Sequence, residues 1–534
     1  MSLLKSQTII TRHLCGMKGI RKLFQQHHLT TTAITTSCFN HQMMNIGGKG
    51  FNTSPSCFGT FHSKRNYSTS GVMHQKYDHS GDNPSHHHHQ QNNNSSSLQK
   101  KNLPLSHLRV LDLSRVLAGP YCTQLLADLG ATVIKIEPPK VGDDTRSWGP
   151  PFMKVEGEGN LHENQSGYFQ CANRGKKSVT VNLKSKNGQQ ILHKLVENCD
   201  ILIENFKVGS LEKFGLDYKS AKAINPNIIY CSITGFGQDS SKSHLPGYDF
   251  VMQAMSGVMS ITGDQNTPPF KVGVAITDVI TGMYAAVGIL SKVIEKQRNH
   301  SNPENVENSS NNSNDWVDLS LLDCNIAYLV NQATNYLQTN NSPKRIGNRH
   351  PNIAPYDLIK CSNGNIVVAV GNDAQFQRFI SVLSSKLNST PFKDLDKFAT
   401  NAQRVANRKQ LLEQIEAITT QFFTKEDLIN ELNKQEVPCG SVNTVGEALA
   451  DAQITERNMI WTFEKSGDEE IQQQSAVRTI GNPLRFINEQ HEVLNLKQFS
   501  SRPPILSEHT EEILKEMIGA KDEEIQAWRK EGTI

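Results

Sequence analysis

The chain has 534 residues, of which 37% are hydrophobic and 20% charged, and its formal net charge is +3. This composition excludes a chain that is disordered throughout, and the length fits one large two-domain unit or two to three domains. The charge is small and no basic stripe with interleaved aromatic residues occurs, so we expect no nucleic acid partner. The ten cysteines form no CxxC pair and no Cys/His ligand spacing, which predicts free thiols and no metal site.

The N-terminal segment is basic and free of acids. Residues 1–77 contain nine Lys or Arg and no Asp or Glu, and apolar and basic residues interleave over 3–24. This pattern is typical of a mitochondrial transit peptide, which we predict over 1–67, with the mitochondrial matrix as the destination. The alternative is a disordered basic tail without an import role. Residues 68–104 are predicted to be a low-complexity linker, although the run His86–His89 could bind metal.

From about residue 105, strand patterns alternate with helix patterns. A helix that begins at Pro120 and ends at Gly130 separates strands at 110–113 and 132–136, and such a βαβ unit implies a parallel sheet. Further helices are expected at 188–198, 218–224, 278–295 and 320–338, and further strands at 201–203, 228–232 and 316–318. We therefore predict an α/β fold with a Rossmann-like large domain over 105–330, carrying a polar surface loop at 297–315. No run of 18 apolar residues occurs, so no membrane span is expected.

The pattern changes after about residue 345. Strand-like runs at 356–360 and 366–370 flank the turn Ser362–Asn365, which predicts a hairpin. Helices are expected at 373–386, 404–421 and 425–434. This predicts a smaller α+β domain over 345–435, and residues 436–534 are predicted to return to the large domain.

Common catalytic motifs are missing: the sequence has no P-loop, no dinucleotide fingerprint, no nucleophile elbow and no H-E-x-x-H. The loop Gly142–Arg146 follows a strand, where α/β folds place ligands. The basic turn Asn173–Ser178 could hold phosphates or be an ordinary solvated turn. Asp278 is the only acid over 265–294. It is either a helix N-cap, which the residues alone favour, or a functional carboxylate.

Taken together, several segments resemble the class III CoA-transferases, the superfamily of formyl-CoA transferase and carnitine-CoA transferase. The matching segments are Val110–Pro120, Leu125–Ala131, Gly142–Arg146, Asn173–Ser178, Asp200–Phe206, Ser232–Gly237, Gly247–Asp249, Val272–Asp278 and Val437–Gly440. The resemblance runs from about 105 to 519 and is strongest to mitochondrial members that act on succinate and hydroxymethylglutarate.

The resemblance implies that Asp278 is the nucleophile, because the catalytic aspartate of the family closes the segment that matches Val274–Asp278. It implies transfer of CoA from an acyl-CoA, such as succinyl-CoA, to a free dicarboxylic acid through a covalent aspartyl-CoA. It also implies that CoA is a substrate, that no cofactor is bound permanently, and that two chains form an interlinked homodimer.

The resemblance also implies which residues contact CoA. They are Leu117, Ala118, Val181, Asn182, Leu183, Lys184, Asn205, Phe206, Lys207, Lys213, Pro246, Gly247, Tyr248 and Asp249. Leu117 stands where formyl-CoA transferase has glutamine, and Pro138 where it has arginine, which disfavours formate and oxalate and favours glutarate or hydroxymethylglutarate. Arg115 or Arg146 could pair with a substrate carboxylate, and a structural salt bridge is the alternative for each.

Two rival functions remain. The α-methylacyl-CoA racemases share the fold but pair the aspartate with a histidine in a Gly-His-Asp segment, whereas this chain has Gly247-Tyr248-Asp249. A tyrosine is a poor partner base at neutral pH. The other rival is a non-catalytic binding protein. Exchange of CoA between succinyl-CoA and free acids separates these functions.

Overall fold

The computed structural model describes residues 103–156, 162–301, 314–387, 391–463 and 476–534. The predicted transit peptide (1–67), nearly all of the linker over 68–104 and residues 302–313 of the predicted surface loop lie outside them. The chain divides into two units, 1–88 and 89–534, and all of the described residues lie in the second.

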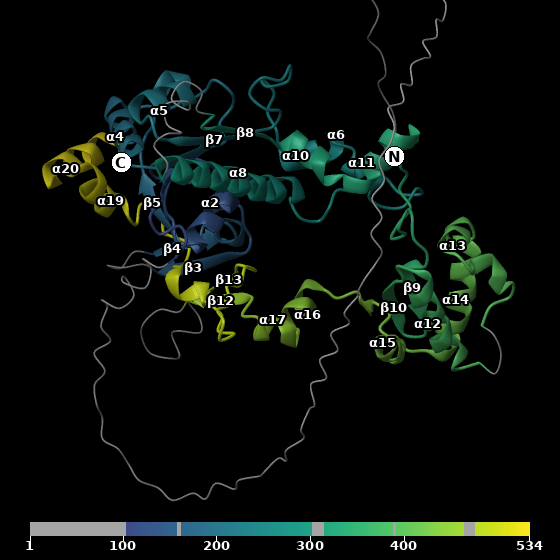
Figure 1. Ribbon diagram of the computed structural model, residues 1–534. Helices are drawn as coiled ribbons and strands as arrows, with labels where there is room; N and C mark the ends of the chain where they lie inside the picture. Colours follow the sequence, from purple (N-terminus) through teal and green to yellow (C-terminus); the bar gives the residue numbers. More distant parts are fainter. Residues whose placement is uncertain (1–102, 157–161, 302–313, 388–390, 464–475) are drawn as a thin grey trace, which may run out of the picture. The chain divides into compact units, whose positions relative to one another are not determined.

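A six-stranded sheet forms the centre of the large domain (Figure 1). Its strands are β1 (Arg109–Asp112), β2 (Thr132–Glu137), β5 (Lys176–Thr180), β6 (Ile201–Glu204), β7 (Ile229–Thr234) and β8 (Trp316–Ser320). Every pair is parallel and the order is β5-β2-β1-β6-β7-β8. The predicted α/β fold with a parallel sheet is confirmed. The chain winds outward from β1 in both directions, so the order reverses between β1 and β6, which is where doubly wound sheets bind ligands.

Helices cover both faces of this sheet, which explains why its strands read as apolar runs rather than as alternating patterns. One face packs against α2 (Ala118–Asp128) and α8 (Ile276–Ser301), and the other against α4 (Lys186–Glu197), α5 (Tyr218–Ile224), α19 (Thr510–Ile518) and α20 (Asp522–Glu531). Neighbouring residues of a strand point to opposite faces of the sheet. Val110 packs in the core with α2 and α8, and Leu111 packs in the core with α4, α5, α19 and α20.

Within the residues described, one helix is long and apolar enough to cross a membrane, namely α8 over Ile276–Asn299. One side of α8 contributes Ala285, Ile289 and Val293 to the core against the sheet, and 39% of the apolar window is buried. Length and composition alone are weak evidence for a span, because a core helix passes the same test.

A separate core lies in the smaller α+β part of the chain. Its antiparallel sheet has the order β11-β10-β9, with β9 (Tyr356–Cys361), β10 (Gly364–Ala369) and β11 (Cys439–Ser441). The predicted hairpin corresponds to β9 and β10. Its helices are α12 (Asp373–Ser384), α13 (Asn401–Ala406), α14 (Arg408–Phe422) and α15 (Lys425–Lys434). The third strand, β11, comes from residues beyond 435, so the small domain extends past its predicted end and these residues do not belong to the C-terminal return.

Several elements were not predicted. The basic turn at 173–178 leads directly into β5, and a hairpin of β3 (Phe152–Glu156) and β4 (His162–Ser166) precedes the short helix α3 (Gly167–Gln170). The helix expected at 320–338 is two helices, α10 (Leu321–Tyr328) and α11 (Val330–Thr339), with Val330 in a left-handed conformation at φ 36°. The remaining elements are α6 (Asp249–Met255), α7 (Val258–Ile261), α16 (Val445–Ala450), α17 (Ala452–Glu456), β12 (Ile460–Phe463) and β13 (Val477–Ile480).

Candidate active site

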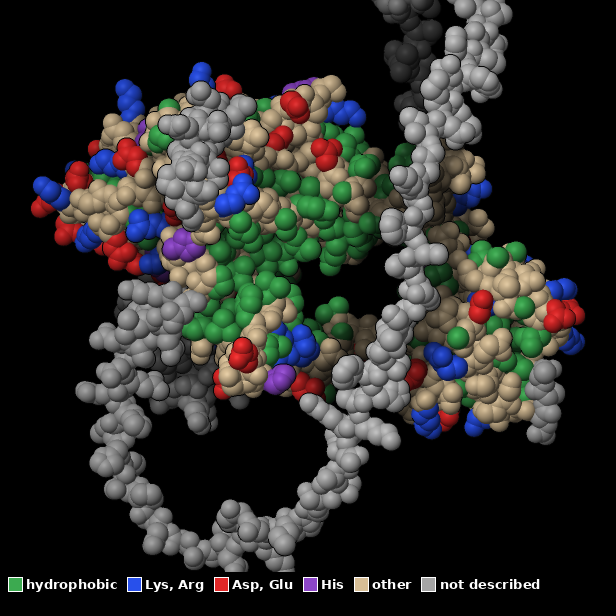
Figure 2. All heavy atoms as spheres, in the orientation of Figure 1, with side chains coloured by type: hydrophobic (Ala, Val, Ile, Leu, Met, Phe, Trp, Pro, Cys, Tyr) green, Lys and Arg blue, Asp and Glu red, His purple; other side chains and the backbone are tan. Residues whose placement is uncertain are grey.

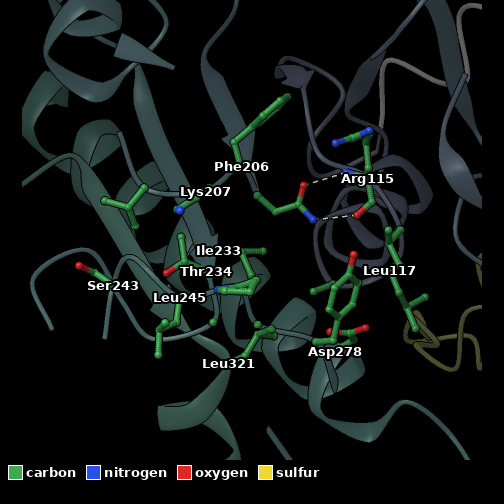
Figure 3. Close-up of a pocket in the computed structure, with 18 of the residues that line it drawn as sticks. Arg115, Leu117, Phe206, Lys207, Ile233, Thr234, Ser243, Leu245, Asp278 and Leu321 are labelled. Carbon is green, nitrogen blue, oxygen red and sulfur yellow. Dashed lines mark hydrogen bonds between the residues drawn. The ribbon is translucent and has the colours of Figure 1, made fainter. Parts of the chain in front are cut away.

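A cavity of about 250 Å³ lies beside the carboxyl ends of the central strands. Its lining comes from the loops after β1, β2, β6 and β7, together with the first turns of α2, α8 and α10. Figure 3 shows Arg115, Leu117 and Asp278 on one side and Lys207, Ser243 and Leu245 on the other. This position agrees with the reversal of strand order between β1 and β6.

Asp278 lies in the first turn of α8, two residues after the helix begins at Ile276. It therefore does not occupy the N-cap position. Instead, Asp249 provides the carboxylate that binds the start of this helix: its Oδ1 accepts the Thr277 backbone N–H at 2.8 Å. Among the residues described, no hydrogen bond or ion pair engages the Asp278 carboxylate. The side chain is thus available for chemistry.

The surroundings of Asp278 favour its neutral form. Burial, followed by the negative charge of Asp249, raises the pKa of Asp278 to about 7. A carboxylate with a raised pKa and no partner is typical of an active site rather than of a structural ion pair.

Asp249 also belongs to a brace that holds the segment before Asp278. Its Oδ2 accepts Gln253 Nε2 at 2.7 Å, and Gln253 Oε1 accepts the Val272 backbone N–H at 2.8 Å. One turn of α6 therefore fixes both ends of residues 272–277, and with them the start of α8.

Two glycines let the loop after β7 fold back on itself at the cavity wall. A Cβ added to Gly235 would lie 2.7 Å from Gly247 Cα, and one added to Gly247 would lie 2.3 Å from Gly235 Cα. Both positions line the cavity. The wall can close in this way only when neither residue carries a side chain.

Arg115 extends from a turn whose backbone is held by Asn205. Asn205 Oδ1 accepts the Arg115 N–H at 2.9 Å and its Nδ2 donates to the Arg115 carbonyl at 2.7 Å (dashed in Figure 3). The Arg115 side chain is 39% exposed, and its Nη1 lies 3.1 Å from the exposed Asp144 carboxylate. In the part of the chain that the structure describes, no group of His, Cys, Asp or Glu side chains could hold a metal ion.

Comparison with known proteins identifies the family. The sequence profile of CoA-transferase family III matches residues 105–510, a stretch that contains the whole cavity lining. The chain belongs to CoA-transferase family III. It is therefore an enzyme that transfers CoA between an acyl-CoA and a carboxylic acid, and the predicted family membership is confirmed.

Individual family III relatives agree over most of the chain. The chain is 39% identical over 419 residues to the succinate–glutarate CoA-transferase of Agrobacterium fabrum, covering 78% of this chain and 96% of the relative. It is 36% identical over 435 residues to the succinyl-CoA:glutarate CoA-transferase of Homo sapiens, covering 81% and 90%. A crystal structure of a CAIB/BAIF family protein from Brucella suis shares 41% identity with a TM-score of 0.63, covering 78% of this chain and 100% of that chain.

The cavity contains most, but not all, of the residues expected at the family III site. Those in its lining are Arg115, Leu117, Ala118, Asn205, Phe206, Lys207, Pro246, Gly247, Tyr248 and Asp278; those outside it are Arg146, Val181, Asn182, Leu183, Lys184, Lys213 and Asp249. Val181 is fully buried in a core, and the Asn182 N–H bonds to the Thr533 carbonyl at 2.8 Å. The Lys213 ammonium lies 4.9 Å from the centre of the Phe214 ring.

For Arg146, the structure favours the alternative of a structural salt bridge. Its guanidinium is buried, with Nη2 2.7 Å from Glu137 and Nη1 2.8 Å from Glu163. It also lies 3.8 Å from the centre of the Phe169 ring. These partners already occupy the fork that would bind a substrate carboxylate.

Trp148 and Tyr168 form an aromatic pair that the sequence did not predict. The rings of Trp148 and Tyr168 pack edge to face with centroids 5.2 Å apart. Burial, followed by the negative charge of Asp278, raises the pKa of Tyr168 to about 12. The two residues lie on either side of the β3–β4 hairpin in the chain, which was not predicted.

Proposed function

We propose that this enzyme transfers CoA from succinyl-CoA to a free dicarboxylic acid, glutarate or hydroxymethylglutarate, through a covalent intermediate on Asp278. The observation that carries the proposal is the unpartnered carboxylate of Asp278 in the cavity. The substrate pair is supported by the relatives from Agrobacterium fabrum and Homo sapiens, whose names specify succinate or succinyl-CoA together with glutarate.

The transfer proceeds in steps that conserve the thioester. A carboxylate oxygen of Asp278 attacks the thioester carbonyl, the C–S bond breaks, and a mixed succinyl–aspartyl anhydride and the CoA thiolate result. The thiolate attacks the aspartyl carbonyl, which forms aspartyl-CoA and releases succinate. The acceptor carboxylate then attacks this thioester, and the expelled thiolate attacks the acceptor carbonyl of the new anhydride, which regenerates Asp278. Covalent capture divides one difficult exchange into easier steps.

We also propose that Arg115 pairs with the second carboxylate of the acceptor. It lines the cavity, and its partly exposed side chain pairs with an exposed carboxylate, so a substrate carboxylate can replace that partner at low cost. Leu117, on the same side in Figure 3, supplies an apolar surface for the methylene chain. Arg146 forms ion pairs with Glu137 and Glu163, so we do not assign it to the substrate.

Trapping of the intermediate tests the nucleophile. With succinyl-CoA present, hydroxylamine should modify Asp278, as read by peptide mass spectrometry. Asp278→Asn should lose CoA transfer by about 10³-fold or more while remaining folded, because the covalent route is closed. Asp239→Asn, which changes an exposed aspartate outside the cavity lining, is the matched control.

Substantial transfer by Asp278→Asn would overturn the mechanism. Epimerisation of a 2-methylacyl-CoA without any acceptor acid would instead indicate racemase chemistry. Binding of CoA with neither reaction would indicate a non-catalytic protein.

A screen of acceptors tests the substrate class. We expect glutarate and hydroxymethylglutarate to outperform malate, oxalate and monocarboxylic acids of equal length. Arg115→Gln should raise the KM for dicarboxylic acids by about tenfold to a hundredfold, which is the value of a charge-assisted hydrogen bond, and Arg115→Lys should lose less. An equal rise in the KM of Arg115→Gln for monocarboxylic acids would contradict the pairing of Arg115 with the second carboxylate.

The assembly and location are proposals as well. We propose a homodimer of interlinked chains, supported by the exposed apolar residues of α8 and α11. Its domains are the large one over 105–330, the small one from 345 through β11, and the C-terminal return to 534. We propose import into the mitochondrial matrix, supported by the acid-free basic segment 1–77. N-terminal sequencing of the mature protein tests the predicted cut after Tyr67.

A further inference from the structure

A strained residue sits in the wall of the cavity. Val116 has φ 70°, in the left-handed region, and it lines the cavity between Arg115 and Leu117. A β-branched side chain is unfavourable there because it crowds the backbone on both sides. Such a conformation persists only where the surroundings determine it, and it is enriched at functional sites.

Side chains hold the backbone on both sides of Arg115. Lys135 Nζ donates to the Ser114 carbonyl at 3.0 Å, and the Asp143 carboxylate accepts the Val116 N–H at 3.3 Å. Asn205 holds both the N–H and the carbonyl of Arg115. Four consecutive backbone groups, from the Ser114 carbonyl to the Val116 N–H, are therefore bound by side chains.

The first two of these side chains form a buried ion pair. Lys135 Nζ lies 2.8 Å from Asp143 Oδ2, and neither side chain is exposed. Burial alone would raise the pKa of Asp143, but the charge and hydrogen bond of Lys135, together with the hydrogen bonds from Thr145, outweigh burial and lower the pKa to about 2. Lys135 extends from β2, so the pair connects the central sheet to the strained turn.

We propose that Lys135 and Asp143, together with Asn205, are positioning residues for CoA transfer. They hold Val116 in the left-handed conformation and thereby fix the turn that presents Arg115 and the start of α2 to the cavity. This inference rests on the proposed function, because it assigns the turn a role in binding both substrates. We call Lys135, Asp143 and Asn205 the turn clamp.

Relief of the strain by glycine gives a specific test. Glycine adopts φ 70° without steric cost, so Val116→Gly should compensate for a weakened clamp. We expect Asn205→Ala to lower kcat/KM by about tenfold to a hundredfold through a small displacement of the turn. Most of this loss should be a higher KM, because the turn binds the substrates whereas Asp278 lies on another element and keeps its position. In the Val116→Gly background, the fold-decrease in kcat/KM caused by Asn205→Ala should be at most about one-third of the decrease that it causes in the wild-type background.

Two further variants probe the other clamp residues. Asn205→Asp can still accept the Arg115 N–H but cannot donate to the Arg115 carbonyl, so its loss should lie between wild type and Asn205→Ala. Lys135→Met combined with Asp143→Asn removes both charges of the buried pair, which avoids an unpaired buried ion. Its loss of kcat/KM should also shrink in the Val116→Gly background, and urea unfolding reports whether each protein is folded.

Arg174 and Asp128 provide the matched control. They form a buried pair with Nη2 2.5 Å from Oδ2, and no hydrogen bond to residues 114–116 involves either residue. Arg174→Met combined with Asp128→Asn should show no compensation by Val116→Gly.

The proposal is overturned if folded clamp variants keep wild-type kcat/KM, if Val116→Gly fails to reduce the loss in Asn205→Ala, or if it compensates the control pair equally. If wild-type protein transfers no CoA, the proposed function fails instead. In that case the dissociation constant of CoA is measured by calorimetry for the same variants, so failure of the turn clamp and failure of the proposed function remain distinguishable.

Discussion

The ionised carboxylate of Asp278 opposes the stability of the fold in which it sits. Its pKa is raised from 3.8 to about 7 by burial, and next by Asp249. Between these two pH values the folded state keeps a proton that the unfolded state has released, so stability falls as pH rises through this range. Below pH 3.8 both states are protonated and the penalty disappears. The site therefore keeps a reactive carboxylate at the expense of stability at neutral and alkaline pH.

The same cause gives a prediction for activity. The value of kcat/KM should rise with pH as free Asp278 loses its proton, with an inflection near 7. Asp249→Asn removes a negative charge but keeps an oxygen to accept the Thr277 N–H, so the inflection should move to lower pH. It should not return to the range of an ordinary aspartate, because burial is the larger cause and remains. The measurement is a pH profile of kcat/KM for succinyl-CoA.

Asp144→Asn provides a control in the same cavity. Its carboxylate lines the cavity but is not among the causes of the raised pKa of Asp278, so the inflection should stay in place even where the KM changes. An inflection that stays unmoved, or moves to higher pH, in Asp249→Asn would refute the electrostatic coupling.

Residue-level prediction reached Asp278 only through the family resemblance. The residues around it favoured an N-cap, since a lone acid before an apolar helix is typical of one. The carboxylate that accepts a backbone N–H at the start of this helix belongs to Asp249 on α6, and α6 itself was not predicted. Contacts between segments distant in sequence decide such roles, and a local pattern does not contain them.

At the scale of elements, strands and helices with strong apolar patterns were predicted well, and polar strands were not. β5 has the sequence KKSVT, and its Lys176 is fully buried with Nζ 3.2 Å from Asp112. β4 has the sequence HENQS, and its Gln165 is buried with Nε2 2.8 Å from the Pro504 carbonyl. Such strands depend on partners elsewhere in the fold, so their own residues carry no alternating signal.

The placement of α8 depends on a missing side chain. A Cβ at Gly282 would lie 2.6 Å from the Ala118 carbonyl, so α8 and the first turn of α2 pack as closely as their backbones allow. Gly282 follows Asp278 by one turn of the helix. This contact therefore sets the nucleophile candidate beside Leu117 and Ala118, which line the same cavity.

At the scale of the whole molecule, the position of the site follows from topology. The six strands run parallel and their order reverses between β1 and β6, and the cavity is lined by the loops that leave those two strands. The alternating pattern along the chain predicted the parallel sheet, but it contained no information on strand order. The location of the cavity could therefore not be derived from periodicity.

An apolar surface along α8 and α11 leads to the last prediction. Met283, Val287 and Ile294 recur at helical spacing on the side of α8 away from its core residues, and Val287 is 62% exposed. On α11, Leu337 is 72% exposed. Figure 2 shows hydrophobic side chains gathered near α8. A monomer rarely exposes so many large apolar side chains together, and a second copy of the chain would cover them in the proposed homodimer.

Charge placed on this surface should therefore weaken the dimer. Burial of an unpaired carboxylate costs on the order of 3 kcal/mol, which corresponds to about a hundredfold in the dissociation constant. Val287→Asp and Leu337→Asp should each shift the wild-type dimer toward monomer in sedimentation over a dilution series. Val141→Asp changes an exposed hydrophobic residue in a loop on neither helix, and it should leave the dimer intact. Monomeric wild-type protein, or equal effects of all three substitutions, would show that this surface does not join two chains.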